Sequence, residues 1–200
     1  MGADVRVCFV GDSFVAGVGD PLLLGWAGRL GGRALADGVA LTAYNLGVRR
    51  QTSADVLARF TAECAQRLPA GTDRRVVLSF GVNDTMHENG GPRVDPETSA
   101  ANLAALLERS AEQGWRVLMV GPVPVDDAAH NARTAALDAR FAEICAAAEI
   151  SYVSVHEVLL GSAVWMREVR AGDGAHPGAP GYDVLAELVL PHWQDWLARR

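Results

Sequence analysis

The chain has 200 residues, half of them hydrophobic, and a formal net charge of −6. Nucleic acids and anionic membrane surfaces bind basic faces, so this charge argues against both as partners. All 18 basic residues are arginine, which excludes P-loop, Schiff-base and Ser-Lys chemistry because each of these needs a lysine amine.

Length and composition also predict how the chain is organised. Two hundred residues without a linker-like tract predict one domain over residues 1–200. Three cysteines that lie far apart, Cys8, Cys64 and Cys145, indicate buried free thiols and no disulfide framework. The N-terminal residues lack the apolar region of a signal peptide, and no apolar run reaches the roughly 18 residues of a membrane span. We therefore predict a cytoplasmic protein; its oligomeric state is not indicated.

Strand-like and helix-like segments alternate along the chain. Runs rich in β-forming residues predict five strands, at residues 5–10, 41–45, 76–80, 116–120 and 151–155. Apolar residues at helical spacing predict helices at residues 22–36, 53–68, 98–113, 133–148 and about 180–198. Ser53 is the expected N-cap of the second of these helices.

This alternation predicts the fold class. The run Val76-Val77-Leu78 is apolar at every position, as in strands that are buried on both faces. Strands alternating with helices indicate right-handed crossovers and a parallel sheet with helices on both sides. The segments 85–97, 121–131 and 172–178 are longer than usual connections, which favours functional loops.

Polar residues follow the first three predicted strands. Ser13 ends the tripeptide Gly11-Asp12-Ser13 after the first strand, Gly47 follows the second, and Asn83 follows the third. Loops at the carboxyl ends of parallel strands converge on one crevice, so we expect these three residues to lie close together. Asp173 and His176 precede the last helix, in a loop that can reach the same edge.

These residue types suit nucleophilic catalysis. A serine is a poor nucleophile unless a base removes its proton, and His176 is the natural base for Ser13. Asp173 lies three residues before His176 and can orient the imidazole. Attack on an acyl carbon creates an oxyanion, which the N–H groups of Ser13 and Gly47 and the amide of Asn83 can stabilise.

The same residues resemble a known family. Gly11-Asp12-Ser13, Gly47, Gly81-Val82-Asn83-Asp84 and Asp173-Gly174-Ala175-His176-Pro177 are similar, in this order, to the four blocks of the SGNH, or GDSL-type, hydrolases. The resemblance spans positions 11 to 177 and implies a flavodoxin-like three-layer α/β/α sandwich with five parallel strands. It also implies an esterase or lipase acting on a small-molecule acyl ester through an acyl-enzyme, without metal or organic cofactor. Phe14 departs from the leucine of the GDSL motif, and the substrate is not implied.

Other functions remain open from the sequence. The same triad could serve an acyltransferase that passes the acyl group to an alcohol. A flavodoxin-like module that binds a small ligand without turnover is the alternative outside enzymes. His87-Glu88 near Asp84 imitates a metal site, but no second histidine lies at helical spacing, so none is predicted.

Several further residues have structural interpretations. Asp12 and Asp84 are expected to accept hydrogen bonds from nearby backbone N–H groups in tight turns. Leu22-Leu23-Leu24 and Trp26 are assigned to the core, with an acyl pocket as the alternative. The other histidines have no partner at a meaningful spacing and are expected to be solvated or to cap helices: His87, His130, His156 and His192.

Overall fold

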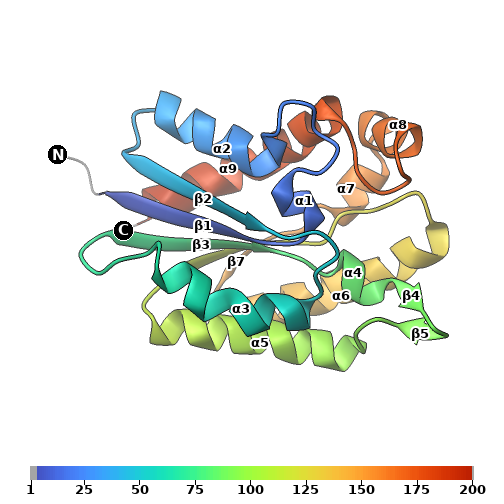
Figure 1. Cartoon of the computed structure of the whole chain (residues 1–200), viewed down its shortest axis with the longest axis horizontal. Helices are drawn as coiled ribbons and strands as arrows, with labels where there is room; N and C mark the ends of the chain where they lie inside the picture. Colours follow the sequence, from blue (N-terminus) through green and yellow to red (C-terminus); the bar gives the residue numbers. More distant parts are fainter. Residues whose placement is uncertain (1–3, 200) are drawn as a thin grey trace.

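A computed structural model describes residues 4–199 and shows an α/β fold (Figure 1). The strands are β1 (Val5–Gly11), β2 (Leu41–Gly47), β3 (Asp73–Ser79), β4 (His87–Glu88), β5 (Gly91–Pro92), β6 (Arg116–Val120) and β7 (Ser151–Val153). The helices are α1 (Ser13–Ala16), α2 (Gly25–Ala36), α3 (Ser53–Ala65), α4 (Val82–Thr85), α5 (Pro96–Glu112), α6 (Ala128–Ala147), α7 (His156–Leu160), α8 (Ala163–Ala171) and α9 (Ala179–Ala198).

Five strands form one parallel sheet in the order β2-β1-β3-β6-β7. With the five strands counted in chain order, this is the 2-1-3-4-5 order of flavodoxin-like folds. The order changes direction between β1 and β3, and ligands bind outside the carboxyl ends of the strands at such a point. The predicted fold class is confirmed, and Ser13 and Asn83 follow the two strands that flank this point.

Helices cover both faces of the sheet, with α2 and α9 on one side and α3, α5 and α6 on the other (Figure 1). Side chains alternate along β1: Val7 and Phe9 enter the core under α2 and α9, whereas Cys8 and Val10 enter the core under α3 and α5. Both faces of the strand are therefore buried, which explains the continuous apolar runs in the sequence.

The boundaries of several elements differ from those predicted. Strand β3 begins at Asp73, because its pairing with β1 starts where Val5 lies opposite Asp73. Helix α3 is capped by Thr52, whose hydroxyl accepts from Asp55 N–H, so Ser53 is not its N-cap. The segment 85–97, expected to be irregular, contains the small β4–β5 hairpin. Helices α1, α4, α7 and α8 were not predicted from the sequence.

Candidate active site

Ser13, His176 and Asp173 form a continuous hydrogen-bonded row at the carboxyl end of the sheet. Ser13 is the first residue of α1, directly after β1. Its Oγ lies 2.8 Å from Nε2 of His176, and Nδ1 of the same ring lies 2.8 Å from Oδ2 of Asp173. The structure thus brings together a serine and a histidine that are 163 residues apart in the sequence.

Asp173 holds both the imidazole and the turn that carries it. Its Oδ1 accepts hydrogen bonds from the N–H groups of Ala175 and His176, at 3.0 and 2.8 Å. Burial by itself raises the pKa of Asp173, but these hydrogen bonds and the one from the imidazole outweigh it and lower the pKa to about 2. The carboxylate is therefore charged at neutral pH, as is required to orient and stabilise an imidazolium.

Aromatic side chains form the wall beside His176. The ring of Phe14 lies 4.9 Å from the imidazole, centroid to centroid, and 6.4 Å from the ring of Trp165 behind it. Both aromatic residues are buried. Phe14 therefore fills the position of the GDSL leucine with a larger apolar surface that packs directly on the imidazole.

Gly47 and Asn83 lie at this edge with hydrogen bonds of their own. The N–H of Gly47 donates to Oδ1 of Asn45 at 2.9 Å. The amide of Asn83 donates to the Gln51 carbonyl at 2.9 Å and lies 3.4 Å from Oδ2 of Asp12. A Cβ at position 47 would lie 2.1 Å from the backbone nitrogen of Ala16, so only glycine lets β2 approach α1.

Asp12 connects the turn of Ser13 to Asn83, a role that local sequence does not reveal. Its Oδ1 caps α1 by accepting from Phe14 N–H at 2.9 Å, as expected for a tight turn, and its Oδ2 faces Asn83. Complete burial, together with the nearby Asp84 carboxyl, raises the pKa of Asp12 to about 7. Asp84 differs from the expectation, because it binds the N–H of Ser53, far away in the sequence.

We expect an Asp12→Asn variant to gain stability relative to wild type as the pH rises. The folded-state pKa of Asp12 lies above the ordinary value of 3.8. The stability that the protonated carboxyl group contributes is therefore fully present below pH 3.8 and is lost as the pH rises to about 7. Asparagine keeps an oxygen to cap α1 and does not titrate. The free energy of unfolding of the variant, relative to that of wild type, should therefore be roughly 2–4 kcal/mol higher at pH 8 than at pH 4.

Urea denaturation at a series of pH values measures this difference. Asp195→Asn, which changes an exposed carboxyl group on α9, is the matched control. A gap between Asp12→Asn and wild type that stays constant from pH 4 to pH 8 would show that Asp12 is ionised throughout that range.

Two of the histidines that were expected to be solvated or to cap helices are buried. His130 is buried, and its Nε2 lies 2.9 Å from the Val82 carbonyl and 3.0 Å from the Thr85 hydroxyl. His156 is also buried. His87 and His192 are exposed, as predicted. Within residues 4–199, no group of three or more His, Cys, Asp and Glu side chains is placed to hold a metal ion.

Comparisons with known proteins show the family of this chain. A model of the GDSL-like lipase/acylhydrolase family matches residues 9–184. The chain belongs to this family. The match begins in β1 and includes the segments of Ser13, Gly47, Asn83, Asp173 and His176. The resemblance noted in the sequence is therefore confirmed at the level of the family.

Individual GDSL relatives agree with this assignment. Esterase TesA of Pseudomonas aeruginosa is 31% identical over 112 residues, which are 56% of this chain and 51% of that protein. The matched part of this chain thus spans about half the length of this curated relative. A crystal structure of TesA shares 26% identity, covers 95% of this chain and 98% of its own, and superposes with a TM-score of 0.78.

More distant structures share the fold. A variant of an acetyl xylan esterase from Geobacillus stearothermophilus is 19% identical, with 96% of each chain covered and a TM-score of 0.78. A lipase/acylhydrolase from Enterococcus faecalis is 21% identical over 94% of this chain and 95% of its own, with a TM-score of 0.77. Across residues 4–199, no helix is long and apolar enough to cross a membrane.

Proposed function

We propose that this GDSL-family chain, acting as one domain over residues 1–200, hydrolyses carboxylic esters with Ser13 as nucleophile. The observation that carries the proposal is the row from Ser13 Oγ to His176 Nε2 and from His176 Nδ1 to Asp173, with both distances 2.8 Å. A serine, a base and an orienting carboxylate within hydrogen-bonding distance are the requirements of nucleophilic acyl transfer. The esterase names of the relatives support the same reaction class.

The proposed reaction has two halves. Ser13 Oγ attacks the acyl carbon while His176 Nε2 takes the hydroxyl proton, and the tetrahedral intermediate then expels the alcohol, which receives that proton. Water attacks the resulting acyl-enzyme and gives a proton to His176. Collapse of the second intermediate releases the carboxylic acid, and the proton returns to Ser13. Asp173 stays ionised in both halves.

Three donors would bind the oxyanion, and they differ in the hydrogen bonds that they already make. The N–H of Ser13 lies in the first turn of α1, beside the nucleophile itself. The Asn83 amide donates to the Gln51 carbonyl and, over 3.4 Å, to Oδ2 of Asp12, so an oxyanion would replace or share the weaker of these two bonds. The N–H of Gly47 already donates to Asn45, so its participation requires that bond to be shared or exchanged.

Labelling with a fluorophosphonate, combined with product analysis, tests this function. We expect one equivalent of probe to bind per chain, at Ser13, and p-nitrophenyl butyrate to yield butyric acid. With competing alcohols present, free acid should remain the main product; a new ester as main product would identify an acyltransferase. A folded chain that takes up no probe would instead indicate a non-catalytic binding module.

A further inference from the structure

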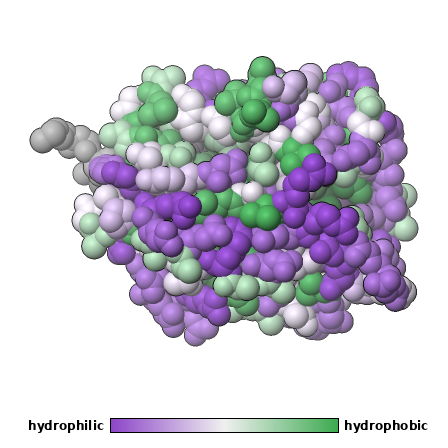
Figure 2. Space-filling view, viewed as in Figure 1, coloured by the Kyte–Doolittle hydropathy of each residue, from purple (hydrophilic) through white to green (hydrophobic). Residues whose placement is uncertain are grey.

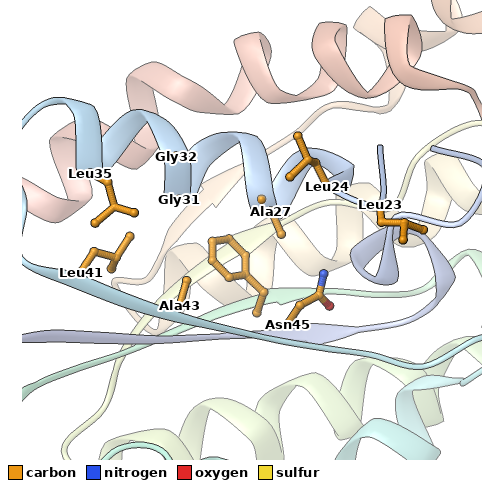
Figure 3. Close-up of a pocket in the computed structure, with 11 residues that line it drawn as sticks. Leu23, Leu24, Ala27, Gly31, Gly32, Leu35, Leu41, Ala43 and Asn45 are labelled. Carbon is orange, nitrogen blue, oxygen red and sulfur yellow. The ribbon is translucent and has the colours of Figure 1, made fainter. Parts of the chain in front are cut away.

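An open apolar groove of about 390 Å³ runs between α2 and the edge strand β2. Leu35 and Leu41 lie at one end, and Leu23, Leu24 and Asn45 at the other (Figure 3). Of the eleven described residues that line the groove, Asn45 has the only polar side chain, and none is charged. Such a lining binds hydrocarbon and gives no partner to an ionic or hydroxyl-rich ligand.

The loop before α2 holds apolar side chains in solvent at this groove. Leu22, Leu23 and Leu24 are 61%, 87% and 44% exposed, so their assignment to the core was wrong, whereas Trp26 is fully buried. The loop is anchored by the buried Asp20, whose carboxylate accepts from the N–H groups of Leu22 and Gly25. Figure 2 shows hydrophobic surface on this side of the molecule, among largely hydrophilic surroundings.

Glycines in α2 keep the groove open. A Cβ at Gly31 would meet the Ala43 side chain at 3.7 Å, which is ordinary contact, and a Cβ at Gly32 would meet nothing within 4 Å. Both residues stand inside a helix, where glycine is less favourable than alanine. The groove is thus a space that larger side chains could occupy without moving the backbone.

The groove adjoins the segments that carry the catalytic residues. Asn45 lines its end, and the amide of Asn45 donates to the carbonyl of Val15, two residues after Ser13 in α1, at 2.7 Å. The loop that presents Leu23 also passes His176, since a Cβ at Gly19 would lie 3.2 Å from that residue's Cβ. An ester bound at Ser13 is therefore close to this end of the groove.

We infer that the α2–β2 groove binds the unbranched hydrocarbon chain of the acyl group, which makes medium- or long-chain esters the substrate class. The inference rests on the proposed function, because the acyl carbon must lie at Ser13. The uncharged lining, the open length and the hydrogen bond from Asn45 to Val15 of α1 favour one flexible apolar chain as occupant. Leu23 and Leu24 then contact the part of the hydrocarbon chain nearest the active site.

The ratio of kcat/KM for p-nitrophenyl decanoate to that for the butyrate tests the inference. Each added methylene should raise kcat/KM of wild type by about twofold to fourfold, because a buried methylene favours binding by up to about fourfold. Gly32→Leu fills the groove and should lower the decanoate-to-butyrate ratio by roughly tenfold or more. Gly32→Ala adds a single methyl group and should lower it only slightly.

A charge placed in the groove is a second, independent variant. Leu35→Glu should lower the ratio in the same way, whereas Val158→Glu, at an equally exposed position on α7, should not. Leu35 and Val158 are each 57% exposed, so neither substitution should prevent folding. Binding of decanoate to the Ser13→Ala variant by calorimetry gives a readout that does not depend on turnover, and adding Gly32→Leu should abolish it.

The outcomes separate the groove from the proposed function. An unchanged ratio in both Gly32→Leu and Leu35→Glu overturns the inference while ester hydrolysis persists. So does sedimentation showing a wild-type dimer that Leu35→Glu dissociates without a change in the ratio, because a second copy would then cover the groove. Absence of all ester hydrolysis would refute the proposed function, and decanoate binding lost in Gly32→Leu would still support the groove.

Discussion

Replacement of Ser13 by alanine is expected to lower kcat/KM for p-nitrophenyl butyrate by about 10⁴-fold or more. The Ser13 hydroxyl is the group that His176 Nε2 contacts at 2.8 Å, and without it no acyl-enzyme can form. KM should change far less than kcat, since a hydroxyl group contributes little to binding of the ground state. Steady-state kinetics with enzyme freshly separated from any contaminating esterase measures the effect.

Ser110→Ala is the matched control for this prediction. Ser110 is also buried, but its hydroxyl donates to the Leu106 carbonyl within α5, on the sheet face opposite α2 and α9. The control should retain wild-type kinetics and fluorophosphonate labelling. Wild-type turnover by Ser13→Ala would refute the proposed mechanism.

Replacement of His176 by alanine is expected to cause a loss of similar size and to remove the acid limb of the pH–rate profile. Wild-type activity should fall at low pH because a protonated base cannot accept the serine proton. Asp173 is not the source of this limb: its lowered pKa, about 2, keeps it ionised at every pH of the assay. Initial rates from pH 4.5 to 8.5 in buffers of constant ionic strength measure both effects.

Two comparisons make the histidine prediction specific. His192→Ala, at an exposed position of α9, should keep both the rate and the profile. Asp173→Asn should lose less activity than Ser13→Ala, because asparagine can still accept from the N–H groups that hold the turn. A wild-type profile that is flat over this range would argue against His176 as the base.

The central strands of the large sheet could be predicted because strands that are buried on both faces have runs of consecutive apolar residues. Residues 76–78 and 117–120 are apolar without interruption, and they lie in β3 and β6. Short elements gave no such signal. Helices α1 and α4 have four residues each, less than two turns, so no periodicity can appear in them. Asp12 caps α1 with its side chain, whereas α4 has no side-chain cap and follows Gly81, whose φ of 124° favours glycine.

The site residues could be predicted because each follows a strand or precedes a helix in a parallel fold. Topology alone brings Ser13 and Asn83 to one edge. The distances and the supporting contacts could not be read in this way. That Asp12 faces Asn83 depends on how α1 and α4 pack, which brings together two residues 71 positions apart in the sequence.

The sequence by itself determined the sheet, the family and the residues of the proposed triad, because these follow from apolar runs, chain order and residue type. Only the tertiary structure decided which side chains are covered. His130 and His156 are buried although nothing local marks them, and Leu22–Leu24 are exposed although they are apolar. The physical reason is that burial depends on the distant segment that packs over a residue. No segment of the described chain packs over Leu23, which is 87% exposed and lines the groove between α2 and β2.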